Sequence, residues 1–393
     1  MDRIQWKKVK LGEMTQIIDG DRGKNYPKNN EFLEKGFCLF LNTGNVTQDG
    51  FFFESNQFIT EEKDSILRKG KLTRGDLVYT TRGTVGNIAF YDRNVQYSNV
   101  RINSGMVILR VNEQYVIASF LYQLLKNDCT RRYIKSFCTG SAQPQLPIKN
   151  LSQILLDLPP IEIQNSIATI LSRYDSLIEN YQKQIKLLEE AAQRLYKEWF
   201  VDLRFPGHEN TKIVNGVPEG WEKKKVGDLI AKSQRTKQVP ANEYLKTGSI
   251  PVIDQSRNYI AGYTNDDECL VNVTVPYIVF GDHTRVLKFI PFSFAKGADG
   301  TQLIMSNDLS RMPQSLFYNS LINIDLSNYS YARHFKYLKE EEIIVPTTDI
   351  SMKYDDLVSK YYQSIQNNRE QIRLLTEARD RLLPKLMSGE IAV

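Results

Sequence analysis

Two long segments of this chain are near copies of each other, and this repeat limits the folds that the chain can adopt. Residues 178–191 read IENYQKQIKLLEEA, and residues 365–378, which lie 187 positions later, read IQNNREQIRLLTEA. A shorter copy, WKKVKLGEM at residues 6–14 and WEKKKVGDL at residues 221–229, has an offset of 215. Repeats at unequal offsets predict two similar halves whose globular parts differ in length. The expected order is module, helix, module, helix.

Both longer segments have the apolar spacing of an amphipathic helix. The first is expected to begin after Pro159-Pro160, and residues 161–200 contain neither Gly nor Pro. In the second, Leu357 and Tyr361 are expected on the apolar face. The residues expected to pair the two helices are Ile178, Ile185, Leu188, Leu195, Ile365, Ile372, Leu375 and Leu382.

A helix of about 35 residues is about 50 Å long, which exceeds what one small domain can bury. We therefore expect the two helices to pack antiparallel on each other as a coiled-coil-like spacer with pseudo-twofold symmetry. The alternative is that each helix packs only on its own domain.

The parts between the helices have the pattern of a mixed sheet. Short β-branched and aromatic runs bounded by Gly, Asn or Asp predict strands near residues 76–80, 86–91, 105–111 and 277–280. Helices are expected at Tyr115–Lys126 and Gln314–Ile324. The predicted fold class is α+β, with two modules of curled mixed sheets. The predicted modules are residues 1–158 and 205–350, and the predicted spacer helices lie in residues 159–204 and 351–393.

Composition leaves nucleic-acid binding open. Residues 1–158 contain 22 Lys and Arg against 16 Asp and Glu (+6), and residues 205–350 contain 16 against 17 (−1). This is not a polybasic footprint, so DNA binding would depend on local patches and side-chain readout. No export signal and no apolar run of about 18 residues is present. The four cysteines lack the spacing of a metal site, which indicates free thiols in a reducing cytoplasm.

The motifs of DNA-modifying and DNA-cutting enzymes are missing. Residues 157–160 (DLPP) have the wrong order for the Asn/Asp-Pro-Pro-aromatic turn of an adenine methyltransferase, and there is no GxxxxGK[ST] phosphate loop. Residues 218–224 (PEGWEKK) only imitate a nuclease motif, because they belong to the repeated Trp segment, whose first copy has Lys7 in place of Glu222. His208, His283 and His334 offer few groups for acid–base chemistry. The sequence predicts no catalytic residue, no metal and no cofactor.

Polar loops of both modules contain the residue types that read DNA bases. Asn and Gln can bond adenine bidentately, Arg can bond guanine, and Thr can contact the thymine methyl group. The candidates in the first module are Arg22, Lys24, Asn25, Tyr26, Asn42, Thr43, Asn45, Thr81, Arg82, Thr84, Ser141, Gln143 and Gln145. Those in the second are Arg235, Lys237, Gln255, Ser256, Arg257, Asp282, His283, Thr284, Arg285, Asp299, Tyr331, Arg333 and His334. Taken singly, each loop is better explained as an ordinary turn than as a DNA contact, because Asn, Gly and Thr dominate turns.

The repeated frame and its flanking motifs resemble the specificity subunits of type I restriction–modification systems. The residues that carry the resemblance are LPPIEIQ at 158–164, KEWFVDLRF at 197–205, GVPEGW at 216–221, GDHTR at 281–285, GADG at 297–300 and LLPKLMSGE at 382–390. The resemblance covers essentially the whole chain. It implies a non-catalytic subunit that selects a two-part site in double-stranded DNA, one half per module. It also implies adenine-specific methyltransferase subunits, two of them expected, and restriction–translocase subunits as partners.

The chain departs from the family pattern at one motif, and two other functions also fit its sequence. The second helix lacks the Pro-Pro-x-x-x-Gln motif and has VPTTD at residues 345–349 instead. The chain could be the recognition fragment of a single-chain restriction–methylation enzyme, with catalytic motifs upstream. It could also be a coiled-coil scaffold that binds only protein. The start at Met1 and the motif at 382–390 favour the separate specificity subunit.

Overall fold

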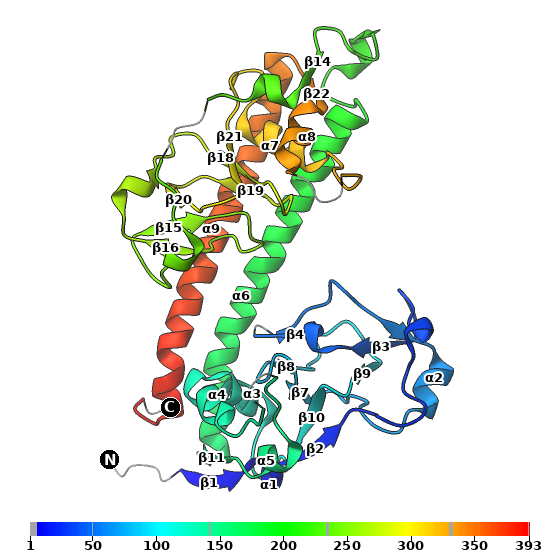
Figure 1. The fold of residues 1–393 in the computed structure, drawn as a ribbon, viewed down its shortest axis with the longest axis vertical. Coiled ribbons are helices and arrows are strands. Elements are labelled where there is room, and N and C mark those ends of the chain that lie inside the picture. The colour runs from blue at the N-terminus through cyan, green and yellow to red at the C-terminus, as the bar shows by residue number, and fades with distance from the viewer. Residues whose placement is uncertain (1–5, 49, 141–142, 233–235, 330–332, 392) are drawn as a thin grey trace. The chain divides into compact units, whose positions relative to one another are not determined.

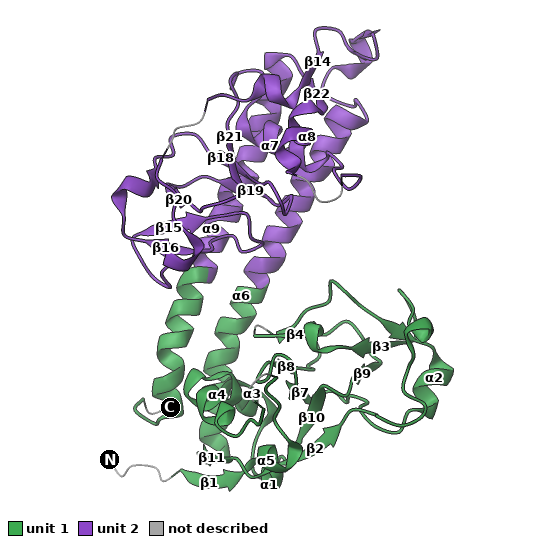
Figure 2. Ribbon diagram, viewed as in Figure 1, with its two compact units in different colours: residues 1–179, 373–393 green, residues 180–372 purple. Residues whose placement is uncertain are grey.

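The computed structural model describes residues 6–48, 50–140, 143–232, 236–329, 333–391 and 393. It forms two compact units, one of residues 1–179 with 373–393 and the other of residues 180–372 (Figure 2). Each of the two long helices, α6 (Ile161–Tyr196) and α9 (Thr348–Met387), contributes a part to both units. Within the described residues, no helix has the length and apolar character needed to cross a membrane.

The first unit has three layers. A four-stranded antiparallel sheet of order β2-β10-β7-β8 lies between a second sheet of order β6-β3-β9 and a helical layer that includes α3 (Figure 1). The strands are β2 (Thr15–Asp19), β3 (Cys38–Leu41), β6 (Phe58–Ile59), β7 (Leu77–Thr80), β8 (Ile88–Phe90), β9 (Val100–Ile102) and β10 (Met106–Val111). Two further pairs are β1 (Lys7–Lys10) with β11 (Leu155–Leu158) and β4 (Val46–Thr47) with β5 (Gly50–Phe51). The helices are α1 (Leu11–Met14), α2 (Glu61–Ile66), α3 (Ala118–Lys126), α4 (Asp128–Lys135) and α5 (Ile148–Ser152).

The alternation of side chains along the central strands explains these layers. In β7, Leu77 and Tyr79 pack towards α3 and the long helices, whereas Val78 packs with Leu39 and Ile102 between the sheets. Successive side chains of a strand point to opposite faces, so a strand that is covered on both faces is apolar throughout.

The second unit repeats this plan with different strands. A sheet of order β19-β18-β21 lies between a helical layer and a sheet of order β16-β15-β20-β17. The strands are β15 (Ile250–Ile253), β16 (Gly262–Thr264), β17 (Leu270–Val271), β18 (Tyr277–Gly281), β19 (Leu287–Ile290), β20 (Phe294–Lys296) and β21 (Thr301–Ile304). Short pairs join β12 (Ile213–Val214) to β13 (Val217–Pro218) and β14 (Glu222–Lys225) to β22 (Glu342–Val345). The helices are α7 (Gln314–Ile322) and α8 (His334–Glu340), and a π-helical turn, η3 (Lys197–Val201), follows α6.

The long helices pack on each other and on their modules within each unit. In the first unit, Leu383 and Leu386 of α9 join Ile167 and Leu171 of α6 in the core. In the second, Ile185, Leu188 and Leu195 of α6 pack on a core that contains Ile365 of α9. The Tyr354 hydroxyl donates to the Ala192 carbonyl and Asn368 donates to Gln184, so the segments run antiparallel. Antiparallel pairing is therefore confirmed, together with packing of each helix on its own module.

The expected apolar face of the second helix was partly wrong. Leu357 is 40% exposed, whereas the expected Ile365 is buried, and Tyr354, Val358 and Tyr362 form the rest of the buried stripe of α9. These residues pack on Trp199, Phe200 and Phe289, so aromatic neighbours decide which face of the helix turns inward. Ile178, Ile372 and Leu375 are only half-buried.

Each module is attached to its helix in the same way, through side chains at two helix positions that are 187 residues apart. In the first unit, the Gln164 amide nitrogen donates to the Tyr115 carbonyl (2.9 Å), and its oxygen accepts from the Ile117 N–H (3.1 Å), just before α3. At the equivalent position of α9, the Ser351 hydroxyl donates to the Arg311 carbonyl (2.7 Å), just before α7. Ser351 thus takes the place of the glutamine that the second helix lacks.

A second matched contact lies farther along the same helices. Gln123 of α3 donates to Asp175 of α6, and the Tyr362 hydroxyl of α9 donates to Asn319 of α7 (2.8 Å). Asp175 and Tyr362 are again 187 positions apart. The internal repeat is therefore a repeat of tertiary contacts as well as of sequence.

Candidate nucleic-acid interface

Four polar loops of the first unit meet where its central strands end. The backbone N–H groups of Thr81 and Arg82 both donate to the Gly105 carbonyl (2.9 and 3.1 Å), which joins the loop after β7 to the loop before β10. Gln145 forms a bridge with Arg82 and pairs with Thr139, which brings in the segment after α4. Thr43, after β3, lies beside Gly83 and Gly105. We call the exposed or half-exposed side chains of this cluster the first loop face, which consists of Arg22, Asn42, Thr43, Arg82, Thr84, Gln143 and Gln145.

The turn that carries Arg22 is held from beneath by a buried carboxylate. Asp21 accepts hydrogen bonds from the N–H groups of Gly23 and Arg68, both at 2.7 Å. Burial opposes the charge, but these backbone hydrogen bonds outweigh it and lower the pKa of Asp21. The turn leaves Arg22 and Lys24 exposed, and Arg22 also donates to the Ser104 carbonyl (3.2 Å).

In the second unit, one glutamine joins three loops. The Gln255 side chain accepts a hydrogen bond from the His283 N–H and donates to the Asp299 carbonyl, both at 3.1 Å. Its backbone carbonyl accepts from the Thr284 hydroxyl (2.6 Å). These bonds hold the loops after β15, β18 and β20 as one surface. The segment before α8 joins them, because the His334 N–H donates to the Asp282 carbonyl (2.9 Å). We call this surface the second loop face, which consists of Gln255, Ser256, Arg257, His283, Thr284, Arg285, Asp299 and Arg333.

Unusual backbone conformations are concentrated in the second loop face. Arg285 and Asp299 have φ values of 60° and 47°, in the left-handed region that non-glycine residues seldom adopt. Gly300 has a φ of 71°, and a Cβ there would lie 2.7 Å from the Gln255 amide. Such conformations persist only where the surroundings fix them, and they are concentrated at functional sites.

Comparison with known proteins shows which proteins this chain is similar to. Residues 3–190 match the model of the type I restriction modification DNA specificity domain. The chain is 29% identical over 348 residues to the specificity subunit of the type I restriction enzyme MjaIX of Methanocaldococcus jannaschii, which covers 81% of this chain and 78% of that protein. It is 23% identical to the HindI specificity subunit of Haemophilus influenzae, which covers 98% of this chain and 99% of that protein.

Over most of its length the chain is similar to the specificity subunits of type I restriction enzymes. The crystal structure of an S subunit from M. genitalium matches 98% of this chain and 97% of its own, with a TM-score of 0.61 at 15% identity. That likeness shows a shared fold.

Four of the predicted contact residues are buried in this protein and hold its loops from within. Asn45 accepts from the Asn42 N–H and donates to two backbone carbonyls, and Thr81 donates to the Gly105 carbonyl. Asp282 accepts from the Phe335 N–H, and the His334 ring lies between the carbonyls of Asp282 and Tyr329. The structure gives these four buried side chains a role in holding the loops, and their contact with DNA stays a prediction.

Several of the other predicted contact residues already have partners within the protein. Lys237 forms ion pairs with Asp266 (2.7 Å) and Glu268, and the hydrogen bond that its ammonium donates to Asp266 raises the pKa of Lys237. A lysine between two carboxylates is a poor phosphate site. Asn25 donates to the Ile66 carbonyl, and Tyr26 packs edge-on against Phe40. Ser141, Arg235 and Tyr331 lie outside the described residues.

One interior group of the protein, Lys288, is not among the residues predicted from the sequence. Lys288 of β19 is 4% exposed and lies beneath the loop that carries Gln255. The signal in the sequence was a single lysine in the apolar run VLKFI at residues 286–290. A charge at an inward-facing position of a strand is costly unless it has specific partners.

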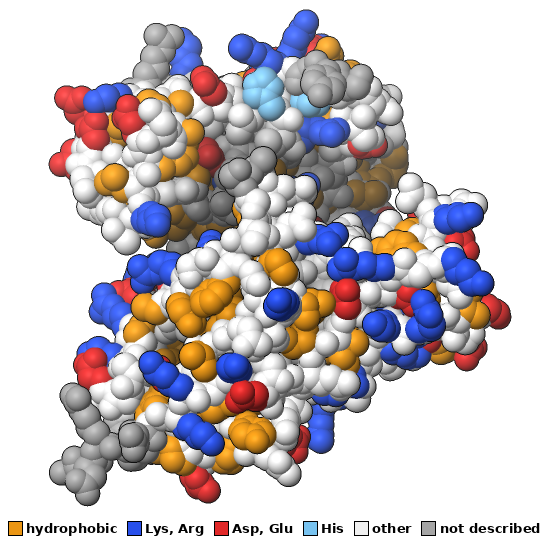
Figure 3. Space-filling model, turned by 60° about the horizontal axis from the view of Figure 1, so that its bottom comes forward, with side chains coloured by type: hydrophobic (Ala, Val, Ile, Leu, Met, Phe, Trp, Pro, Cys, Tyr) orange, Lys and Arg blue, Asp and Glu red, His pale blue; other side chains and the backbone are white. Residues whose placement is uncertain are grey.

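The excess of basic side chains lies in the first unit. Figure 3 shows Lys and Arg side chains spread over the face of the first unit that is turned towards the viewer, with apolar side chains exposed between them. This agrees with the charge of +6 on residues 1–158. Positive charge is what attracts the phosphate backbone of a nucleic acid. Among the residues that the structure describes, no group of three or more His, Cys, Asp or Glu could hold a metal ion.

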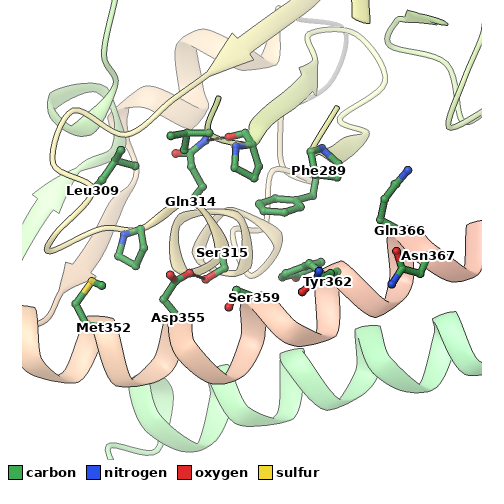
Figure 4. A pocket seen from close by; sticks show the side chains of 15 residues that line it. Phe289, Leu309, Gln314, Ser315, Met352, Asp355, Ser359, Tyr362, Gln366 and Asn367 are labelled. Atoms are coloured by element: carbon green, nitrogen blue, oxygen red, sulfur yellow. Dashed lines mark hydrogen bonds between the residues drawn. The ribbon is translucent and has the colours of Figure 1, made fainter. Parts of the chain in front are cut away.

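A pocket of about 500 Å³ lies in the second unit, beside α9 and the start of α7. Phe289, Met352 and Tyr362 contribute apolar walls, and Asp355 accepts a hydrogen bond from Ser315 (2.6 Å; Figure 4). Its lining residues include no member of the second loop face. We therefore assign it no part in base reading.

Proposed function

We propose that this protein is a specificity subunit that reads a two-part sequence in double-stranded DNA, with one half read by each loop face. It would direct two adenine-specific methyltransferase subunits per chain to that site. In the full complex it would also direct restriction–translocase subunits there. The observation that carries this proposal is that both units hold Arg, Gln and Thr side chains on a surface of interlocked loops. Those side chains form the hydrogen bonds and methyl contacts that distinguish base pairs in the major groove.

The two loop faces share no residue pattern, which supports two unrelated half-sites. The first offers Arg22, Arg82 and Gln143 on a basic unit, and the second offers Gln255, Arg257 and Arg285 on a unit without net positive charge. We expect the first unit to contribute more of the salt-dependent phosphate binding. The second would depend more on base contacts, because contacts to base edges rather than to phosphates carry the sequence information.

We further propose that residues 1–158 and 205–350 are the two target-recognition domains and that the long helices are the spacer between the half-sites. The 36 residues of α6 and the 40 of α9 support this role, because a 36-residue helix is about 54 Å long. Such a helix can span at most about one and a half turns of DNA, at about 34–36 Å per turn. The names of the relatives, all specificity subunits of restriction enzymes, support the proposed partners.

Methylation mapping tests this proposal directly. Cells that carry the subunit together with its methyltransferase partner should show adenine methylation at one motif with two fixed parts and an unread gap. The purified chain alone, given S-adenosylmethionine, should transfer no methyl group, and activity should appear when the partner is added. A continuous motif without a gap, or methyl transfer by the chain alone, would contradict the proposal.

A further inference from the structure

A buried lysine joins the two ends of a loop in the second unit. The Lys288 ammonium donates to the backbone carbonyl of Asp254 (2.8 Å) and to that of Asn258, and it lies 3.7 Å from the Asp254 carboxylate. Between these two ends the loop carries Gln255, Ser256 and Arg257, which belong to the second loop face. One side chain thus fixes the span of the loop.

The position of Lys288 suits an apolar residue better than a charged one. It is 4% exposed on β19, on the strand face of Ile290, which is part of the core between the two sheets. Burial lowers the pKa of Lys288 to about 8, although the Asp254 carboxylate acts in the opposite direction. A charge in such a place is destabilising unless its hydrogen bonds are satisfied. Here its partners all belong to the loop, so the lysine orders the loop and adds little to the core.

The same loop controls the rest of the second loop face. The Asp254 carboxylate accepts from the N–H (2.9 Å) and the hydroxyl (2.6 Å) of Ser256. Gln255 then binds the backbone of His283 and Asp299 on the two neighbouring loops. A displacement of residues 254–258 would therefore be transmitted to every loop of this surface.

We propose that Lys288 is the positioning residue of the second loop face: it does not contact DNA, but it sets the geometry with which this face reads the second half-site. This inference rests on the proposed function and adds a determinant of specificity to it. A side chain held within about 0.5 Å of its reading position discriminates bases better than one on a loose loop.

The first unit has a chemically different version of the same arrangement, which supplies an internal control. Arg101, also buried, donates to the carbonyls of Asp64 (2.8 Å), Leu67 (3.1 Å) and Lys69 (2.7 Å) and pairs with the Asp64 carboxylate. The N–H of Arg68, in that same loop, donates to Asp21, which supports the turn of Arg22. An arginine remains charged at any pH that the protein survives, whereas a lysine with a lowered pKa does not.

The test compares base discrimination at the two half-sites. The full chain, in complex with its methyltransferase subunit, selects from a DNA library randomised at both half-sites. Wild type is compared with Lys288→Met, which keeps the length but removes the charge, and with Lys288→Arg. Lys296→Met is the matched control, because burial also lowers the pKa of Lys296 but, among the described residues, its ammonium has no loop carbonyl as partner.

We expect Lys288→Met to reduce discrimination at the second half-site by about tenfold, within the range of one lost base contact. Discrimination at the first half-site, and binding to DNA of random sequence, should be unchanged. Lys288→Arg should recover part of the loss, and Lys296→Met should behave as wild type. Equal discrimination by wild type and Lys288→Met at both half-sites would overturn the inference. A wild type that selects no two-part sequence at all would instead count against the proposed function.

A pH series on the wild type keeps the inference testable if Lys288→Met does not fold. Raising the pH from 7 to 9 crosses the lowered pKa of Lys288 and removes most of the positive charge that faces Asp254, whereas arginine side chains stay charged over this range. Asp254 is the charged group that the structure describes within ion-pair distance of Lys288, and the Tyr244 hydroxyl lies 3.5 Å from the far oxygen of that carboxylate. Discrimination should fall above about pH 8 at the second half-site only. Parallel profiles for the two half-sites would overturn the inference.

Discussion

Replacing Gln164 by Ala should detach the first module from its helix at a defined point. The Gln164 side chain is 1% exposed and makes three hydrogen bonds, to the Tyr115 carbonyl, the Pro159 carbonyl and the Ile117 N–H. At about 1 kcal/mol for each bond, the free energy of unfolding should fall by about 3 kcal/mol, and the better helix propensity of Ala would recover only about 0.4 kcal/mol. For a unit of this size, that corresponds to a melting temperature lower by about 5–12 °C.

The matched control is Ser351→Ala, at the equivalent position of the second helix. Its side chain makes one hydrogen bond, to the Arg311 carbonyl, so its loss should cost about 1 kcal/mol. Urea unfolding gives both values, and hydrogen exchange should locate the effect of Gln164→Ala at the start of α3 and that of Ser351→Ala at the start of α7. A smaller effect for Gln164→Ala than for Ser351→Ala would refute the reasoning from hydrogen-bond count.

Three further predictions concern DNA reading and the helices. Arg285→Ala should relax specificity at one base position and weaken DNA binding by about 1–3 kcal/mol if the guanidinium bonds a base edge. An equal loss of affinity for all sequences in a binding titration would show a phosphate contact instead. Unchanged affinity and an unchanged methylation motif would exclude both kinds of contact. Inserting four residues, one helical turn, into both helices at residues 179–191 and 366–378 should lengthen the unread gap by one or two base pairs in a methylation map; an unchanged gap would show that the helices do not set the spacing. A chain that ends at Gly207 lacks α9, so the apolar stripe of α6 should pair with a second copy and give an isologous dimer that reads a palindromic two-part site. A monomer in light scattering at micromolar concentration, with the methyltransferase subunit present, would contradict that expectation.

The features that could be predicted from the sequence are those that depend on local periodicity. The helical spacing around Ile185 and Ile372, and the short β-branched run in residues 105–111, identified α6, α9 and β10 because each pattern lies within one element. Leu357 was assigned to the wrong face because the aromatic groups that bury Tyr354 and Tyr362 come from distant segments. Periodicity within α9 cannot report on them.

The residue types of the candidate site could be predicted from the sequence, but which of its side chains are buried could not. The residue types that read bases also hold loops together, so Asn45 and Asp282 could not be told apart from Asn42 and Thr284. Lys288 was missed for the opposite reason, since a lysine in an apolar strand has no meaning until its partners, 30 or more residues away, are known. Such contacts become visible only when the chain has folded.

The division of each long helix between two units has a consequence for synthesis on the ribosome. The core of the first unit includes Leu383 and Leu386, which are made 212 and 215 residues after Leu171 of the same core. The second unit, in contrast, is one continuous stretch, residues 180–372. Domains that fold as units during translation follow the order in which their parts emerge from the ribosome. A nascent chain can therefore complete the second unit while Ile167 and Leu171 still lack their partners from α9. A transcript broken before α9 would leave the first unit with an open apolar groove, accessible to chaperones and proteases.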